Sequence, residues 1–233
     1  ADAKPTLAAL NGKLPISDHD AEAVADRLRD SVARRVEELV DGEPPLTSPG
    51  ALQAVREGVP DDAIVAADAG GFRIWTLATF PAAGPRSYVN PGSWATMGSG
   101  LPSALGAQAA NPDSDVVALT GDGGLMMAVH ELHTAADEDL PVTTVVFRNE
   151  DYAIISDGAE RDHGLPQGTY AWPDTPIDFV ALAESMGVGA ARAETPAEVR
   201  EAVEAAVDAD EPRLVEVPTD PEEPQASDYL SGN

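Results

Sequence analysis

Short apolar runs alternate with longer segments of helical period over residues 46–217 of the chain. Apolar residues dominate the runs 63–67, 116–119, 142–147, 188–191 and 214–217, as in strands that are buried on both faces of a parallel sheet. The segments between these runs carry apolar residues at the spacing of an amphipathic helix. The pattern therefore predicts an α/β fold, a doubly wound and mostly parallel sheet with helices on both faces.

Polar and helix-breaking residues mark the expected ends of several elements. Ser17 with Asp20 is typical of a capping box before an amphipathic helix over 18–40, and Ser48-Pro49 predicts the start of another helix. Further helices are expected over 72–79, 103–110, 125–137 and 177–186, and after the cap formed by Thr195, Pro196 and Glu198.

Three parts are expected along the chain. Residues 1–45 are interpreted as an N-terminal segment with a helical linker, 46–217 as the α/β domain and 218–233 as an acidic, frayed tail. The glycines and prolines of 156–176 predict a long irregular loop, which usually serves as a lid or substrate wall. His163 lies in that loop. A contact between His163 and the substrate is one interpretation, but the more common role of such a residue is contact with solvent or with the loop itself.

Polar residues follow two of the predicted strands directly. Asp122 belongs to a glycine turn after the run 116–119, and Asn149 follows the run 142–147. Because the carboxyl ends of parallel strands form the ligand edge of such a sheet, we expect these two side chains to be neighbours. Their oxygens suit Mg²⁺, which fills its octahedron with water and substrate phosphates. Gly123 and Gly124 would let the N–H groups of a helix N-terminus approach those phosphates.

This stretch resembles the diphosphate-binding segment of thiamine diphosphate (ThDP) enzymes. The matching segments are Gly121-Asp122-Gly123, Glu131-Leu132-His133-Thr134-Ala135, Leu140-Pro141-Val142, Arg148-Asn149 and Tyr152-Ala153-Ile154-Ile155. The resemblance implies that Asp122, Asn149 and the backbone carbonyl of Asp151 bind Mg²⁺. Residues that it places beside the cofactor are Tyr152, Ala153 and Ile154.

Two residues depart from the family's pattern in this stretch. Arg148 replaces the first residue of an Asn pair, which leaves the metal ligand Asn149 intact. Ala153 replaces a Gly, so the backbone at this position has to avoid positive φ.

Two further glycine turns resemble parts of acetolactate synthase-like enzymes. In Asp68-Ala69-Gly70-Gly71 the resemblance implies that Gly70 and Gly71 meet the diphosphate, while Gly71 and the next residue replace a polar pair of the family. In Ala95-Thr96-Met97-Gly98 it implies that Met97 is a catalytic wedge between the two cofactor rings. The backbone of Ala95 would accept a hydrogen bond from the aminopyrimidine. A Met that merely fills the core is the alternative reading of Met97.

Acidic residues dominate the charge of the chain, 41 Asp and Glu against 14 Lys and Arg, for a formal net charge of −27. A field of this sign disfavours binding to nucleic acid or an anionic membrane. It is typical of a halophile's proteins, because molar salt shortens the Debye length to about 3 Å and screens self-repulsion. The sequence has no cysteine, no apolar run of membrane-spanning length and no signal peptide, so we expect a cytoplasmic location and no thiolate site.

The family resemblance implies a reaction as well as a cofactor. We expect the diphosphate-binding part of an acetolactate synthase-like enzyme that decarboxylates a 2-oxo acid and joins the product to an acceptor. A benzoylformate decarboxylase-like enzyme is the alternative, favoured by Tyr152-Ala153-Ile154-Ile155 and by the segment 177–182. Two alternatives belong to other functional classes: a ThDP-binding module without catalysis, and a nucleotide-binding domain that uses the turn 121–123 for another phosphate. The sequence does not identify the 2-oxo acid.

The resemblance also implies partners. The start at Ala1 without an initiator Met, and the likeness of 2–10 to the last strand and helix start of the family's central domain, predict a fragment of a longer chain. No segment resembles the family's pyrimidine-binding domain, whose Glu activates the aminopyrimidine across a subunit interface. We therefore expect that domain as a partner, a homo-oligomeric assembly, and no activity from this chain alone.

Overall fold

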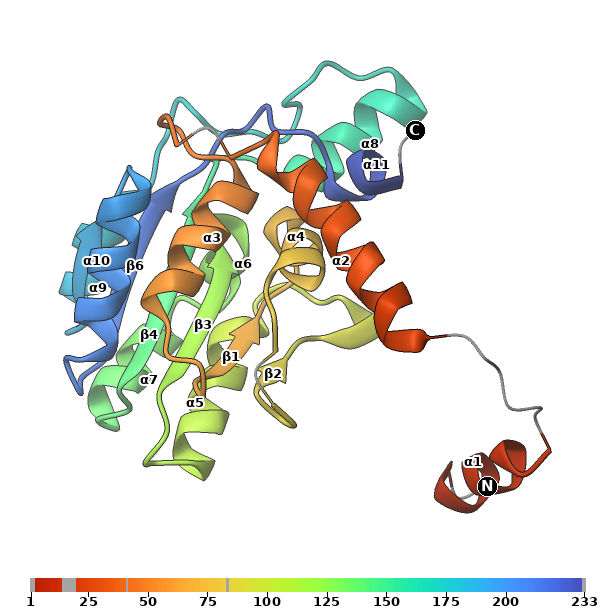
Figure 1. The fold of residues 1–233 in the computed structure, drawn as a ribbon. Coiled ribbons are helices and arrows are strands. Elements are labelled where there is room, and N and C mark those ends of the chain that lie inside the picture. Colours follow the sequence, from red (N-terminus) through yellow and green to blue (C-terminus); the bar gives the residue numbers. More distant parts are fainter. Residues whose placement is uncertain (1–2, 14–19, 41, 83, 232–233) are drawn as a thin grey trace.

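A six-stranded sheet forms the centre of the protein in the computed structural model, which describes residues 3–13, 20–40, 42–82 and 84–231 (Figure 1). The strand order is β2-β1-β3-β4-β6-β5, and every neighbouring pair is parallel. The strands are β1 (Ile64–Ala67), β2 (Tyr88–Val89), β3 (Val116–Gly121), β4 (Val142–Arg148), β5 (Gly189–Arg192) and β6 (Arg213–Pro218). The predicted parallel α/β sheet is confirmed.

Helices cover both faces of this sheet (Figure 1). On one face lie α2 (Ala21–Glu37), α3 (Ser48–Gly58), α4 (Gly71–Thr79), α10 (Pro196–Val207) and α11 (Ala226–Ser231). On the other lie α5 (Gly100–Ala110), α6 (Asp122–Met127), α7 (Glu131–Asp137) and α9 (Phe179–Ser185). The remaining helices are α1 (Ala3–Asn11), the short 3-10 turn η1 (Gly92–Trp94) and α8 (Ala153–His163).

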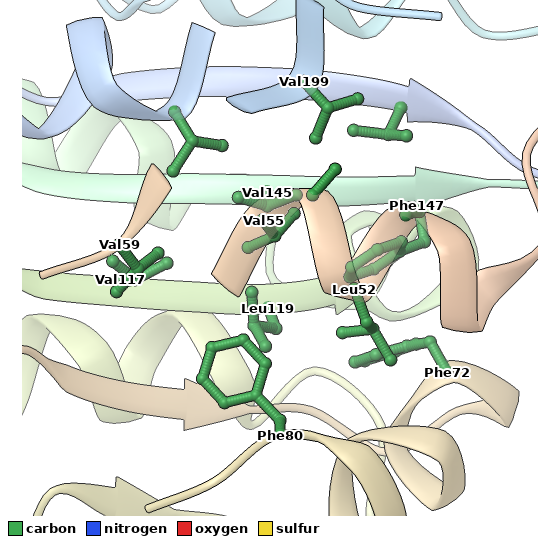
Figure 2. Packing of buried hydrophobic residues seen from close by; sticks show 14 of the residues in the cluster. Leu52, Val55, Val59, Phe72, Phe80, Val117, Leu119, Val145, Phe147 and Val199 are labelled. Atoms are coloured by element: carbon green, nitrogen blue, oxygen red, sulfur yellow. The ribbon is translucent and has the colours of Figure 1, made fainter. Parts of the chain in front are cut away.

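Successive residues of each central strand enter different cores. Val117 and Leu119 of β3 belong to the cluster under α3 and α10, whereas Val116 and Ala118 belong to the cluster under α5 and α9. Figure 2 shows the first cluster, in which Leu52 and other α3 residues pack onto the strands. Burial on both faces explains why these strands are apolar runs rather than alternating patterns.

Side-chain caps fix several helix starts. Thr195 and Glu198 form the predicted capping box of α10. The carboxylate of Asp20 accepts from the N–H of Ala23 at the start of α2, while Ser17 lies outside the described residues. At α3 the cap is Thr47 rather than the predicted Ser48-Pro49, because the Thr47 hydroxyl reaches the N–H of Gly50.

The predicted single helix over 125–137 is wrong, since the chain forms two short helices there. A turn at Ala128 separates α6 from α7. Leu125 and Leu132, on opposite sides of the turn, are both buried in the same core cluster. Periodicity reports which residues are buried, and two helices facing one cluster give nearly the same pattern as one continuous helix.

The predicted irregular loop over 156–176 is wrong for its first half. Helix α8 runs to His163 and ends at Gly164, which adopts the left-handed conformation with φ 64°. A side chain at Gly158, inside this helix, would meet only the flexible end of Arg161, at 3.9 Å. The glycines that favoured a loop are therefore one tolerated helix position and one helix C-terminus.

The predicted fraying of the 218–233 tail is wrong for its described residues, which pack against the domain. The N–H of Thr219 donates to the carbonyl of Arg148 at 2.8 Å, and the N–H of Asp220 donates to the carbonyl of Leu46 at 2.9 Å. Further along, Ala226 is buried and the Tyr229 ring lies 5.9 Å from that of Trp75. Trp75, which is 1% exposed, is thus a packing residue.

The N-terminal segment carries no strand in its described part. Residues Ala3–Asn11 form α1, which lies apart from the α/β body in Figure 1, so the expected closing strand of a preceding domain is not observed there. The division into 1–45, 46–217 and 218–233 stays a prediction. Within the described residues, no helix is both long and apolar enough to cross a membrane.

Candidate functional site

The carboxyl ends of β1, β3 and β4 bring the predicted site residues together. Asp122 begins α6 directly after β3, and only 3% of its surface is exposed. One carboxylate oxygen accepts from the N–H of Gly123 at 2.7 Å. The other accepts from the N–H groups of Asn149 at 3.1 Å and Glu150 at 2.7 Å, both just past β4. The expected proximity of Asp122 and Asn149 is confirmed.

Burial raises the pKa of Asp122 to about 6, and its hydrogen bonds limit that rise. The N–H groups of Glu150, Gly123 and Asn149 and the charge of Arg148 all favour the anion. At neutral pH the group is therefore mostly ionised. A buried anion with backbone donors fixing its position is the form in which a carboxylate binds a cation.

The segment after β4 is folded by its own side chains. The amide oxygen of Asn149 accepts from the N–H of Asp151 at 3.1 Å, and the Asp151 carboxylate accepts from the hydroxyl of Ser156 at 2.6 Å. The left-handed residue in this turn is Glu150, with φ 60°. Ala153 begins α8 and is absent from the described positive-φ residues, in agreement with the constraint placed on it.

The two glycines after Asp122 are places of close approach. A Cβ at Gly123 would lie 2.5 Å from the Tyr152 ring and 3.3 Å from the terminal methyl of Met97. A Cβ at Gly124 would lie 2.6 Å from the carboxylate of Asp68. The structure thus brings Met97 and Tyr152 onto the turn that carries Asp122, and glycine is needed there to admit them.

The loop before α5 holds Met97 and Ala95. Met97 is partly buried, and Ala95 is exposed in the left-handed conformation with φ 51°. Gly98 has φ 79°, and a side chain there would also meet Met127 of α6 at 3.0 Å. Both facts explain why the sequence has a glycine at this position.

The first glycine turn lies beside the same edge, between β1 and α4. A Cβ at Gly70 would lie 2.7 Å from the Phe72 ring, which stacks on Phe147 of β4 with centroids 5.0 Å apart. The position of a Cβ on Gly71 is 4.0 Å from Ile154 of α8. These contacts connect the turn after β1 with the end of β4 and with α8.

Residues that the sequence did not single out support the site. Trp172 lies edge-on to Tyr152 with ring centroids 4.9 Å apart, and the backbone N–H of Trp172 donates to the carbonyl of Glu150 at 2.8 Å. Ala171 pairs with Asp151 in an isolated antiparallel bridge. The only sequence signal for this support was the aromatic residue inside a segment expected to wall the substrate.

A buried ionic cluster lies next to Asn149. Glu216 of β6 is fully buried, with one carboxylate oxygen 2.6 Å from Arg148 and 3.0 Å from Arg192. Arg148 also pairs with Glu150. The arginine that replaces the family's Asn therefore ties the end of β4 to β6, a role that required the strand order to be known.

Residues 68–217 match the family model described as thiamine pyrophosphate enzyme, C-terminal TPP binding domain. The match spans more than half of the chain and contains the segments that follow β1, β3 and β4. The chain belongs to this family. Its TPP-binding domain is accordingly a binding fold for thiamine diphosphate, which is the same molecule as thiamine pyrophosphate.

Curated relatives of the TPP-binding domain are acetolactate synthases. The chain is 39% identical over 158 residues to a probable acetolactate synthase large subunit of Methanococcus aeolicus, covering 68% of this chain and 26% of the relative. It is 33% identical over 181 residues to the acetolactate synthase isozyme 1 large subunit of Escherichia coli strain K12, covering 77% and 32% respectively. The chain thus spans about a quarter to a third of the length of these relatives.

A solved structure shares the fold as well. The ThDP-dependent 4-hydroxybenzoylformate decarboxylase of Rhodococcus jostii RHA1 superposes with a TM-score of 0.69 at 32% identity, over 75% of this chain and 33% of that one. The shared architecture is the doubly wound parallel sheet predicted from the sequence.

Proposed function

We propose that this domain is the Mg²⁺- and diphosphate-binding part of an acetolactate synthase-like enzyme that acts on a 2-oxo acid. The observation that carries the proposal is the buried Asp122 carboxylate, fixed by three backbone N–H groups beside Asn149 at the carboxyl edge of the sheet. Membership of the TPP-binding family and the acetolactate synthase relatives support it.

The side chains present fit a cation that bridges a diphosphate. Asp122 offers an ionised carboxylate, Asn149 an amide oxygen and Asp151 a backbone carbonyl, which are the oxygen ligands that Mg²⁺ prefers. Gly123 and Gly124 lie in the first turn of α6, and the phosphates are proposed to lie against this helix N-terminus. Bound ThDP would supply the decarboxylation of the 2-oxo acid, while the protein holds and orients it.

The remaining residues of the edge would orient the cofactor and exclude water. Met97 and Tyr152 converge on Gly123, and Trp172 holds Tyr152 in place. Exposed apolar side chains surround this edge, among them Trp94 at 87%, Met127 at 53% and Ile155 at 55% exposure. We infer that the pyrimidine-binding domain of a partner covers them, which also requires a homo-oligomer or a second subunit.

Titration with two cofactors tests this function. The chain joined to its pyrimidine-binding half is expected to bind ThDP only when Mg²⁺ is present, and not to bind NAD. NAD binding, or ThDP binding that is unaffected by chelation of Mg²⁺, would favour a nucleotide-binding domain or another mode of phosphate binding instead.

A benzoylformate decarboxylase-like activity is the second candidate, favoured by the Rhodococcus jostii structure. The complete enzyme separates the two reactions by its products. Acetolactate from pyruvate supports the first proposal, and an aromatic aldehyde released from benzoylformate without carboligation supports the second.

The Met97→Ala substitution in the complete enzyme is expected to lower kcat by about 100-fold, because misplacing a reacting group by about 1 Å costs that much. The Kd for ThDP should change far less, since the diphosphate end supplies most of the binding. Met186→Ala is the matched control, a partly buried Met packed against the core under α9. A raised Kd with an unchanged kcat would show that Met97 only packs.

The charge of the chain leads to a prediction on salt. We propose a cytoplasmic protein of a halophile, whose unfolding midpoint rises by roughly 5–10 °C between low and molar KCl, as a few kcal/mol of screened repulsion would give. Replacing the exposed Glu184 and Glu204 by Gln should flatten this dependence, because two repelling charges are removed. A midpoint that does not respond to KCl would contradict the halophile proposal.

A further inference from the structure

Asp68 has more hydrogen-bond donors around it than any role assigned above requires. It directly follows β1 and is 1% exposed. One carboxylate oxygen accepts from the N–H of Ala69 at 2.7 Å and from the N–H and hydroxyl of Ser99 at 3.1 and 3.2 Å. The other accepts from the N–H of Gly98 at 3.0 Å and the hydroxyl of Thr120 at 3.1 Å.

These donors come from three segments that are far apart in sequence. Ala69 belongs to the turn after β1, Gly98 and Ser99 to the loop before α5, and Thr120 to the end of β3. Met97 precedes Gly98 directly, so the backbone that carries the Met97 side chain is fixed to Asp68. Thr120 stands two residues before Asp122, so the same carboxylate also reaches the diphosphate turn.

Two glycines make room for Asp68. A Cβ at Gly100 would lie 2.8 Å from the Asp68 Cβ, and one at Gly124 would lie 2.6 Å from its carboxylate. These glycines therefore admit the carboxylate between the two turns. A longer side chain at 68 would meet the same backbone, so the position selects for Asp over Glu.

We propose that Asp68 is a positioning residue that sets the place of Met97 relative to the turn 121–124. The effect of Asp68 on the cofactor rests on the proposed function, because it requires that Met97 contacts ThDP. The link that Asp68 makes between the two turns is a property of the protein alone. It acts on the cofactor through the loop that it holds.

The Asp68→Asn substitution breaks this link with little change in volume. An amide offers one acceptor oxygen, and its NH₂ group would face either the donors of Ser99 or those of Gly98 and Thr120. At least two hydrogen bonds to a charged acceptor are lost in either orientation.

Hydrogen exchange in the full chain measures the link without any cofactor. In Asp68→Asn the amides of Gly98 and Ser99 are expected to exchange at least about tenfold faster, since bonds to charged acceptors are the strong class. The amides of Asn149 and Glu150, which bind Asp122, should keep their protection. Glu198→Gln is the matched control, because that carboxylate also accepts two backbone N–H groups, in the cap of α10.

A second readout uses the complete enzyme. Asp68→Asn is expected to lower kcat by on the order of tenfold or more while the Kd for ThDP and Mg²⁺ rises much less, because the metal ligands stay in place. Unchanged exchange at 98 and 99, or equal acceleration at 149 and 150, would overturn the positioning role. If wild type fails to bind ThDP, the proposed function falls, and the exchange result still decides the link.

A milder variant covers the case in which Asp68→Asn does not fold. Thr120→Val removes one hydroxyl donor from the oxygen that Gly98 shares and keeps the shape of the side chain. If Asp68 holds the loop, the Gly98 amide is expected to exchange more than about threefold faster than in wild type, because the shared oxygen is then held less firmly. A change of less than about threefold in either direction would mean that Asp68 does not hold the loop. An unchanged rate at Gly98 with a lowered midpoint of unfolding would overturn the proposal.

Discussion

Replacing Asp122 by Ala in the complete enzyme is expected to abolish Mg²⁺-dependent ThDP binding. The substitution removes the one ionised carboxylate proposed to hold the cation at the diphosphate. Even groups that only hydrogen-bond to a metal ligand are typically worth about 10- to 100-fold in affinity, so the loss of a ligand should raise the Kd by more than about 100-fold. Isothermal titration of ThDP with and without Mg²⁺ measures this directly.

Asn149→Ala separates metal binding from folding. Asp122→Ala also leaves the N–H groups of Gly123, Asn149 and Glu150 without their acceptor, which costs about 1–3 kcal/mol for each buried group left unsatisfied. Asn149→Ala keeps these three hydrogen bonds and leaves only the N–H of Asp151 without its acceptor, so it should lose ThDP binding with a smaller fall in the unfolding midpoint.

The exposed Asp113→Ala is the control for both variants, because it removes a carboxylate from a turn between α5 and β3, at the other end of the sheet. Its affinity for ThDP should equal that of wild type. Near-native affinity in both Asp122→Ala and Asn149→Ala would remove the metal assignment.

The second large effect is that these 233 residues alone should not decarboxylate pyruvate or benzoylformate with ThDP and Mg²⁺ present. Asp122 and Asn149 can hold the diphosphate, but no segment of the sequence resembles the domain whose Glu activates the aminopyrimidine. Positioned proton transfer is worth about 10²- to 10⁴-fold in rate, and here the reaction depends on it. Product formation over hours, compared with cofactor alone, measures the residual rate.

Complementation of this chain with its missing half is the experiment in which activity should appear. Adding a separately expressed pyrimidine-binding half should restore turnover, and the same half with its Glu replaced by Gln should not. A chain carrying Asp122→Ala should also fail to complement. Turnover by the isolated chain at the rate of the complete enzyme would mean that an activating carboxylate lies within these residues.

Local patterns were sufficient for much of the fold. The apolar runs predicted five of the six strands because a strand buried on both faces has no polar side, and only the two-residue β2 escaped this signal. The cap at Thr195 and Glu198 was predictable because a capping box is completed within four residues. The same strand ends predicted that Asp122 and Asn149 would meet, since β3 and β4 are neighbours in a parallel sheet.

Interpretation failed where local signals were ambiguous. Gly158 and Gly164 indicated a loop, although one lies within α8 and the other ends it. The acidic, proline-bearing tail had the composition of a frayed end, yet Ala226 and Tyr229 pack against the core under α4. In both cases tertiary packing outweighed a weak preference of the backbone.

The sequence by itself determined the parallel sheet and the oxygen-bearing side chains that follow its strands, because each depends on residues close together or on the regular topology of such folds. Only the tertiary structure decided how that edge is held. The donors to Asp68 lie up to 52 positions away, and the buried Glu216 meets Arg148 and Arg192 from two different strands. A period or motif records which residues are buried, but hydrogen bonds between distant segments depend on which segments the fold places side by side.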